Sequence, residues 1–254
     1  MTKDYKRITT NVLQEMKDNK EKISMLTSYD FTLAKIVDNA GIDVILVGDS
    51  ASNVMAGHET TLPITLDHMI YHAISVVKAA SRALVVVDLP FGSYQGDSKK
   101  ALRSSIRIMK ESGAHAVKLE GGGEIIDSIE RILTAGIPVM GHLGLLPQTA
   151  EKYSVQAKKS SDAVNLLEDA KILEKAGVFS IVFEMVTRDV AKIITESVKV
   201  PTIGIGSGIN CDGQVLVVHD MLGMFEKIKP KFAKRYLNLS EEIRNAINSY
   251  VKDV

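Results

Sequence analysis

The stretch Ala-Val-Lys-Leu-Glu, residues 116–120, is a short apolar run that contains one lysine and ends on a carboxylate. Three other runs end in the same way: Asp-Val-Ile-Leu-Val-Gly-Asp (43–49), Leu-Val-Val-Val-Asp (84–88) and Ser-Ile-Val-Phe-Glu (180–184). Their last residues are 39, 32 and 64 positions apart, and 64 is twice 32. Because a strand, a helix and their loops take about 30 residues, each acid is expected to end one strand of a repeating βα unit.

The four terminal acids are Asp49, Asp88, Glu120 and Glu184. Parallel strands bring their carboxyl ends to one edge of a sheet, which is where α/β enzymes bind substrates. Carboxylates gathered there repel one another unless a cation or a proton lies between them. The pattern therefore predicts a metal-assisted enzyme.

Short apolar strands alternate with amphipathic helices along most of the chain. The expected strands are 23–28, 43–47, 84–87, 115–119, 138–141, 180–183, 201–205 and 214–218. The expected helices are 31–40, 66–80, 99–112, 124–135, 162–176, 189–197 and a helical tail from Ser240. Eight strands with crossover helices favour a closed (β/α)₈ barrel over an open doubly wound sheet. Residues 1–254 are expected to form a single barrel domain, with a short N-terminal extension and C-terminal helices.

The composition excludes several classes of protein. Lys plus Arg and Asp plus Glu both total 31, so the formal net charge is zero and no basic field is available for nucleic acid. No apolar run approaches the roughly 20 residues of a membrane span, and the N-terminus has no signal-peptide pattern. The single cysteine, Cys211, allows no intramolecular disulfide. We expect a cytoplasmic protein that binds neither nucleic acid nor membrane.

Asp49, Asp88 and Glu120 offer oxygen ligands from three neighbouring strand ends, without a histidine or thiol pattern. Oxygen ligands of this kind suit Mg²⁺ or Mn²⁺ better than zinc. The alternative is that each acid caps the helix that follows it, since Asp is a common N-cap residue. Their shared position after strands favours the metal site.

Lys118 lies two residues before Glu120, so both side chains face the same side of the strand. A lysine there could pair with a substrate carboxylate, and the alternative is a plain Lys-Glu ion pair. Glu184 is expected across the barrel mouth from the other acids, in a position to remove a proton as general base. The alternatives for Glu184 are a fourth metal ligand or a helix cap.

Two further residues are candidate substrate contacts. Ser50 follows Asp49 directly, and His142 lies between two glycines in Gly-His-Leu-Gly. A lone histidine is more often structural, so both readings of His142 stay open. The segment Gly-Ile-Gly-Ser-Gly (204–208) has the glycines of a phosphate loop, but its spacing favours a tight turn between strands.

Long motifs in a fixed order carry a resemblance to a known family. They include Val-Gly-Asp-Ser (47–50), Gly-His-Glu-Thr-Thr-Leu-Pro-Ile-Thr (57–65), Val-Lys-Leu-Glu-Gly-Gly (117–122), Gly-His-Leu-Gly-Leu-Leu-Pro-Gln (141–148) and Pro-Thr-Ile-Gly-Ile-Gly-Ser-Gly (201–208). From about residue 5 to its end, the chain resembles the ketopantoate hydroxymethyltransferase (3-methyl-2-oxobutanoate hydroxymethyltransferase) family.

The resemblance implies a barrel of the phosphoenolpyruvate/pyruvate superfamily type. It implies transfer of a one-carbon unit from 5,10-methylenetetrahydrofolate to 3-methyl-2-oxobutanoate, giving 2-dehydropantoate in pantothenate biosynthesis. By motif, Asp49, Asp88 and Glu120 match the Mg²⁺ ligands, and Glu184 matches the proton acceptor. Asp49, Ser50, Asp88 and Lys118 match the ketoacid contacts. The family also implies a homo-oligomer, commonly a decamer of two pentamer rings.

Two alternative functions stay open at this stage. One is a related barrel that cleaves or rearranges 2-oxo acids, although such lyases typically use a cysteine loop and Cys211 follows the seventh strand. The other is a barrel that binds a ketoacid or acts as a scaffold without catalysis. Clustered like charges argue against a scaffold, because they lower stability without benefit to it.

Overall fold

The computed structural model describes residues 6–225 and 230–254, and its strands close into an eight-stranded parallel barrel in sequence order. The strands are β1 (Ile23–Thr27), β2 (Val44–Val47), β3 (Leu84–Asp88), β4 (Ala116–Glu120), β5 (Val139–Gly144), β6 (Ser180–Glu184), β7 (Thr202–Ile205) and β8 (Gly213–Leu216). Pairing of β8 with β1 closes the ring. The predicted (β/α)₈ barrel is confirmed.

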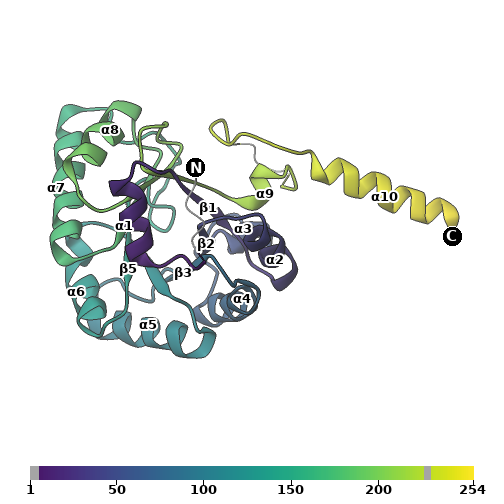
Figure 1. The fold of residues 1–254 in the computed structure, drawn as a ribbon, viewed down its shortest axis with the longest axis horizontal. Coiled ribbons are helices and arrows are strands. Elements are labelled where there is room, and N and C mark those ends of the chain that lie inside the picture. The colour runs from purple at the N-terminus through teal and green to yellow at the C-terminus, as the bar shows by residue number, and fades with distance from the viewer. Residues whose placement is uncertain (1–5, 226–229) are drawn as a thin grey trace.

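Helices surround the barrel and also extend from it (Figure 1). They are α1 (Thr10–Asp18), α2 (Phe31–Asn39), α3 (Ala51–Val54), α4 (Leu66–Ala79), α5 (Ser98–Ser112), η1 (Gly123–Ile125), α6 (Ile126–Thr134), α7 (Ser160–Ala176), α8 (Arg188–Ser197), α9 (Val218–Met221) and α10 (Leu239–Asp253). Residues 206–212 join β7 to β8 through bends, without a helix. Among the helices described, none is long and apolar enough to cross a membrane.

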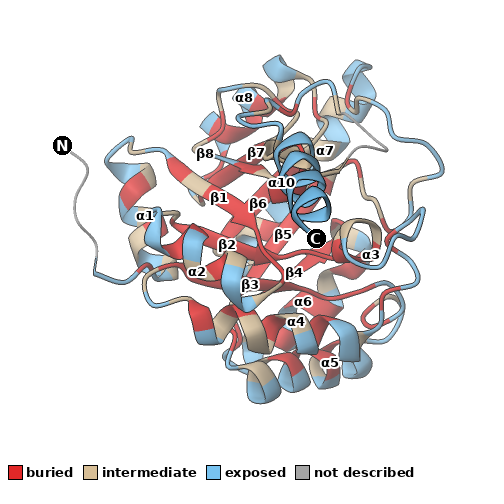
Figure 2. Ribbon diagram, turned by 90° about the vertical axis from the view of Figure 1, so that its right-hand side faces the viewer, coloured by how far each residue is buried: buried red, intermediate tan, exposed pale blue. Residues whose placement is uncertain are grey.

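Strand alternation separates an apolar barrel base from a charged barrel mouth. Val86 of β3 and Ala116 of β4 belong to a buried apolar cluster inside the barrel. Successive side chains on one face of a strand are two residues apart, so the next inward positions are Asp88 on β3 and Lys118 and Glu120 on β4. Figure 2 shows the strands as a largely buried layer beneath the helices.

Helix α1 contributes to the apolar base of the barrel. Its buried Leu13 and Met16 join the same inner cluster as Ile23 and Val44. Full burial of a side chain such as Leu13 stabilises the fold by roughly 1.5–3 kcal/mol. The side chain of Thr9 accepts a hydrogen bond from Val12 N and so caps the start of the helix.

One strand is longer than the sequence pattern predicted. The fifth strand was expected to end at Gly141, but β5 continues to Gly144 because residues 142–144 keep pairing with β6. His142 therefore lies inside the strand rather than in the loop after it. Its side chain points to the barrel interior, on the same face as Met140.

Helix α10 projects away from the barrel (Figure 1) and buries none of its residues. Backbone hydrogen bonds from Leu239 N to Leu222 O and from Ser240 N to Gly223 O fix its first turn against the segment after α9. Its exposed apolar residues recur at helical spacing, and they are Ile243, Ile247, Tyr250 and Val251. This apolar face has no partner within the described chain. An isolated helix of this length is marginal in water, so the helix lacks the packing that would stabilise it.

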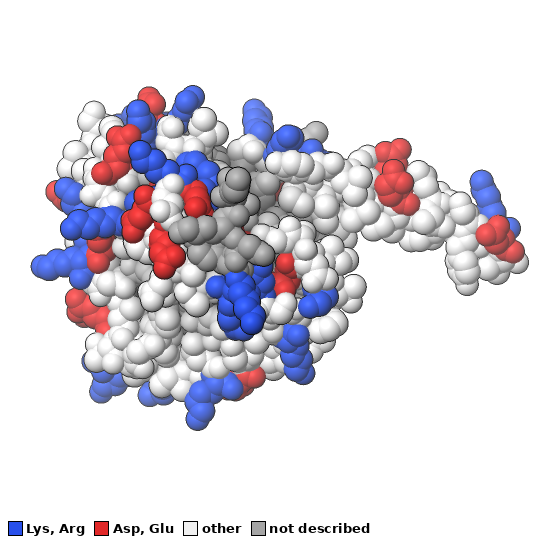
Figure 3. All heavy atoms as spheres, in the orientation of Figure 1, with Lys and Arg blue, Asp and Glu red and all other residues white. Residues whose placement is uncertain are grey.

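Charged side chains of both signs are interspersed over the face of the molecule seen in Figure 3. This mixture agrees with equal totals of basic and acidic residues in the sequence.

The closure of the barrel depends on the small size of Gly213, which pairs with Ile23 of β1 and Ile203 of β7. A methyl group there would lie 2.5 Å from Ile23 O and 2.6 Å from Ile203 Cδ1. We expect Gly213→Ala to lower the free energy of unfolding by about 1–3 kcal/mol, because the strands must move apart. Urea denaturation measures this, with Gln214→Ala on the exposed neighbour as control. Equal stability of the two variants would contradict the expectation.

Candidate functional site

Three carboxylates from neighbouring strand ends meet at the barrel mouth. Asp88 ends β3, Glu120 ends β4, and Asp49 lies two residues after β2. They are only 6% (Asp49), 3% (Asp88) and 5% (Glu120) exposed, and the backbone N of Asp49 donates to Asp88 Oδ2 at 3.0 Å. The strand-end acids therefore form a buried group, as their spacing in the sequence predicted.

Lys118 supplies the positive charge in this buried group. Its Nζ lies 2.8 Å from Asp88 Oδ1 and donates to His142 Nδ1 at 3.2 Å. Burial alone would lower the pKa of the ammonium, but the carboxylates of Asp88, Glu120 and Asp49 outweigh it and raise the pKa. Lys118 is therefore a buried, permanently charged group.

His142 lies between Glu184 and the buried group of acids. The ring Nε2 of His142 lies 3.4 Å from Glu184 Oε2, and its Nδ1 lies 3.5 Å from Glu120 Oε1. Burial and the charge of Lys118 lower the pKa of His142, so the ring is neutral. Because Nδ1 accepts from Lys118, the ring hydrogen belongs on Nε2, facing Glu184.

Asp49, Glu120 and Glu184 each have a pKa raised above that of an ordinary carboxyl group. Burial, and then the charge of Asp88, raises the pKa of Asp49 to about 7. Burial and the charge of Asp49 also raise the pKa of Glu120. Burial raises the pKa of Glu184 to about 7, against the opposing effect of Lys118. One lysine does not neutralise this much negative charge, so the site favours an additional cation or protons.

Each of the three metal-ligand candidates accepts an anchoring hydrogen bond through one of its oxygens. Asp88 Oδ2 accepts from Asp49 N, while Asp49 Oδ2 and Glu120 Oε2 accept from Gln148 at 2.9 and 3.0 Å. Among the described residues, Asp88 Oδ1 has only its ion pair with Lys118, and Glu120 Oε1 lies 3.5 Å from His142 Nδ1. These oxygens are the chemical type that Mg²⁺ and Mn²⁺ prefer.

The carboxylates are not drawn together around a common point. Within residues 6–225 and 230–254, no group of three or more His, Cys, Asp or Glu side chains already has the arrangement of a metal site. Buried anions repel one another, and a divalent cation between them would lower that repulsion. The donor set and the charge excess fit such an ion.

The helix-capping alternative for the strand-end acids is wrong. The N-cap of α5 is Asp97, that of α6 is Ile125 and that of α8 is Thr187. Ser50 precedes α3, and its side chain makes no cap hydrogen bond. The side chains of these acids therefore lie at the barrel mouth and do not cap the helices that follow.

Ser50 is half-buried beside the acids and shares a hydrogen bond with the hydroxyl of Tyr29 at 2.8 Å. Gly48 leaves space between the Ser50 hydroxyl and the Asp88 carboxylate. A methyl group at Gly48 would lie 2.9 Å from Ser50 Oγ and 3.5 Å from Asp88 Oδ2. The predicted substrate contact therefore lies next to the acid group, with its hydroxyl already held by Tyr29.

Sequence reasoning missed the roles of Gln148 and Tyr94. Gln148 is 3% exposed, and Tyr94 is 1% exposed. The Tyr94 hydroxyl accepts from Glu120 N at 3.1 Å and lies 2.9 Å from Gln148 Oε1. Gln148 ends the motif that begins at Gly141, but nothing in its type or spacing distinguishes it there as an acid contact.

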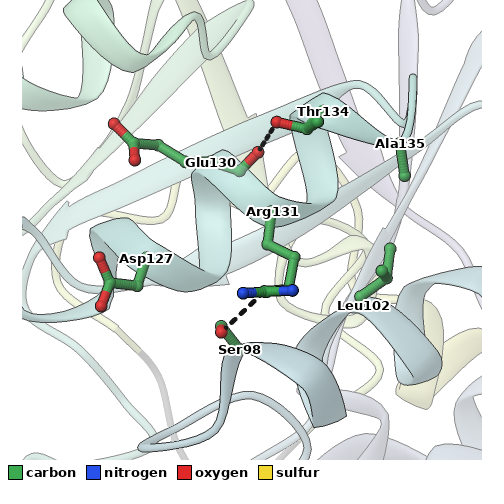
Figure 4. Close-up of a pocket in the computed structure, with 7 residues that line it drawn as sticks. All are labelled: Ser98, Leu102, Asp127, Glu130, Arg131, Thr134 and Ala135. Atoms are coloured by element: carbon green, nitrogen blue, oxygen red, sulfur yellow. Dashed lines mark hydrogen bonds between the residues drawn. The ribbon is translucent and has the colours of Figure 1, made fainter.

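A separate surface pocket of about 600 Å³ lies between α5 and α6 (Figure 4). Arg131 spans it and donates from Nε to Ser98 Oγ at 2.9 Å. The lining residues are Ser98, Leu102, Asp127, Glu130, Arg131, Thr134 and Ala135. None of them belongs to the buried acid group, so this pocket is not part of the site at the barrel mouth.

The fold and its buried charges define a (β/α)₈ barrel protein with an acidic site at the strand ends. Within that class, residues 7–254 match the family described as ketopantoate hydroxymethyltransferase, and the chain belongs to this family. The resemblance inferred from the motifs is therefore confirmed.

Two relatives with high sequence identity carry the same name. A 3-methyl-2-oxobutanoate hydroxymethyltransferase of Flavobacterium johnsoniae is 68% identical over 99% of this chain and 94% of that protein. One of Christiangramia forsetii is 66% identical over the same shares. The crystal structure of 2,3-dimethylmalate lyase, a member of the PEP mutase/isocitrate lyase superfamily, matches with a TM-score of 0.64 at 13% identity, covering 96% of this chain and 87% of that one. This last likeness shows a shared barrel fold.

The raised pKa of Glu184 predicts a pH-dependent stability. With an ordinary pKa of 4.5 and a folded pKa of about 7, Glu184 binds its proton more tightly in the folded state. The stability it contributes is complete below pH 4.5 and is lost as the pH rises through about 7. We expect Glu184→Gln to raise the free energy of unfolding at pH 8 by about 1–3 kcal/mol, with little effect at pH 4.5.

Chemical denaturation with EDTA at both pH values measures this effect. The control is Glu196→Gln on the surface of α8. The Glu196 side chain is 66% exposed, so its replacement should change neither free energy. An equal response of wild type and Glu184→Gln to pH would contradict the shifted pKa.

Proposed function

We propose that this protein transfers a one-carbon unit from 5,10-methylenetetrahydrofolate to 3-methyl-2-oxobutanoate, giving 2-dehydropantoate for pantothenate biosynthesis. Water supplies the hydroxyl oxygen of the product, since the methylene unit carries none. The observation that carries the proposal is the buried contact of Lys118 with Asp88 among further carboxylates at the barrel mouth. It supplies both signs of charge that a metal-dependent reaction of a 2-oxo acid needs.

The proposed cofactor is Mg²⁺, held by Asp49, Asp88 and Glu120. When bound, a divalent cation acts as a Lewis acid that makes the C3 proton of a 2-oxo acid easier to remove. The fit rests on the carboxylates described above, each of which accepts one anchoring hydrogen bond, with Asp88 Oδ1 also paired to Lys118.

The remaining residues have separate roles in the proposed reaction. Lys118 offsets the negative charge of the ketoacid and of the enolate formed from it, because its ammonium is buried and permanently charged. Ser50 and His142 contact the ketoacid, together with Asp49 and Asp88. Glu184 takes the C3 proton onto its carboxylate, and the Nε2 hydrogen of His142 faces that carboxylate.

Glu184 suits a general base because its position differs from that of the ligand candidates. Its side chain is 15% exposed, compared with 4% for Asp88 and 3% for Glu120, so it is more accessible than these two ligand candidates. Its raised pKa of about 7 lies near neutral pH, where a carboxylate is a stronger base than an ordinary one.

The proposal extends to the cellular setting of the protein. We place it in the cytoplasm as one domain over residues 1–254, acting on a small ketoacid and a folate without nucleic acid or membrane. A free, buried Cys211 agrees with a reducing compartment.

Exchange of the C3 hydrogen of 3-methyl-2-oxobutanoate in D₂O tests the role of Glu184. With Mg²⁺ and no folate, we expect Glu184→Gln to bind the ketoacid but to lose exchange by about 100- to 10,000-fold. In the wild type, exchange should rise by about tenfold per pH unit and level off above a pH of about 7, because only the ionised carboxylate accepts a proton. Proton NMR measures the rate, and unchanged exchange in the variant would remove Glu184 from this role.

Adding 5,10-methylenetetrahydrofolate to the same mixture then separates the possible functions. Formation of 2-dehydropantoate identifies the transferase. Cleavage of the ketoacid would indicate the lyase chemistry of related barrels. Binding of metal and ketoacid with neither exchange nor product would indicate a scaffold.

We also propose that the protein is a homo-oligomer and that α10 lies in a contact between subunits. Its apolar face includes Ile243, Ile247 and Tyr250, and none of these side chains is buried by the described chain. A second copy of the chain would supply the missing apolar partner. The decamer expected from the family is the size we propose.

A charge placed on α10 tests this contact. We expect Ile247→Glu to shift the mass measured by light scattering to a smaller assembly, because burial of the new carboxylate is unfavourable. The matched control is Asn245→Glu, which adds the same charge on the opposite side of the helix, two residues away. The proposal fails if the wild type is a monomer or if both variants keep its mass.

A further inference from the structure

Gln148 joins two of the acids through two different groups. Its side-chain Nε2 donates to Asp49 Oδ2 at 2.9 Å, and its backbone N donates to Glu120 Oε2 at 3.0 Å. These partners lie 99 and 28 residues away in the sequence. One buried residue therefore restrains carboxylates that come from two separate strand ends.

The amide of Gln148 has only one favourable orientation. Nε2 donates its second hydrogen to Leu89 O at 3.0 Å, so both hydrogens face acceptors. On the other side, Oε1 lies 2.9 Å from the Tyr94 hydroxyl and accepts from Gln95 Nε2 at 3.1 Å. A flipped amide would place its oxygen against a carboxylate and a carbonyl, where both contacts are repulsive.

Tyr94 connects this amide to the end of β4. Its hydroxyl accepts from Glu120 N and lies 3.0 Å from Glu120 O and 2.9 Å from Gln148 Oε1. The single hydroxyl hydrogen can be donated to one of these two oxygens at a time. Tyr94 thus fixes the position of the Gln148 amide relative to the backbone of Glu120.

We propose that Gln148 is a positioning residue that fixes the directions of the Asp49 and Glu120 carboxylates, so that their second oxygens share one divalent cation. Tyr94 supports it by fixing its amide. This inference rests on the proposed function, because it takes these carboxylates as ligands. Gln148 acts through the two acids, because both hydrogens and the oxygen of its amide already have partners within the protein. Partners of this kind commonly set metal affinity, and their loss costs about 10- to 100-fold.

Metal affinity without ketoacid provides a readout that does not depend on turnover. Gln148→Met keeps the length of the side chain and the backbone contact to Glu120 but removes the donor to Asp49. We expect its dissociation constant for Mn²⁺, measured by calorimetry, to rise by about 10- to 100-fold. In activity assays, the Mn²⁺ concentration for half-maximal rate should rise likewise, while kcat at saturating Mn²⁺ changes much less.

The control is Gln95→Met. It removes the other donor to Gln148 Oε1 without touching an acid, and Mn²⁺ affinity should stay within about twofold of wild type. A double-mutant cycle completes the test: in an Asp49→Ala background, Gln148→Met should weaken Mn²⁺ binding little further, because the contact through which it acts is already gone.

If Gln148→Met fails to fold, as judged by circular dichroism, Tyr94→Phe takes its place with an expected loss of about 3- to 10-fold. Wild-type Mn²⁺ affinity in the folded variant overturns the inference, and so does lost activity with unchanged affinity. A full additional loss in the Asp49→Ala background also overturns it. Absence of Mn²⁺ binding by the wild type instead overturns the proposed metal site itself.

Discussion

The imbalance of buried charge at the barrel mouth is the constraint on which the site depends. One ammonium, that of Lys118, faces the carboxylates of Asp49, Asp88, Glu120 and Glu184. Burial makes each charged form costly unless it is paired, and one lysine cannot pair with four acids. Protons taken up by the acids, or a divalent cation, restore the balance. The excess of buried negative charge that lowers the stability of the fold therefore also favours binding of a metal ion.

The rest of the barrel makes this arrangement possible. The inward positions at the base of the strands are apolar and pack with α1, whereas those at the mouth are charged. A well-packed base offsets the cost of the buried charges above it. Such a division, with stability at one end of the strands and chemistry at the other, is typical of (β/α)₈ enzymes.

The sequence was sufficient to predict the barrel and the meeting of its strand-end acids. Both depend on local patterns, since two-residue alternation sets which side of a strand Lys118 and Glu120 occupy, and parallel pairing brings strand ends together. Contacts between distant segments could not be predicted in this way. Gln148 reaches Asp49 across 99 residues, and no residue type or spacing marks that pair. The projection of α10 away from the barrel could not be predicted either, because a helical pattern does not indicate what packs against its apolar face.

Proton release on metal binding tests the central claim most directly. Calorimetric titration of the protein with Mg²⁺ near pH 6.5, in buffers that differ in ionisation enthalpy, counts the protons lost per ion bound. If buried acids with raised pKa values form the site, one ion should bind per chain with net release of protons, and the release should disappear well above pH 7. Binding without proton release at pH 6.5, or no binding at all, would show that these carboxylates do not gather around a cation.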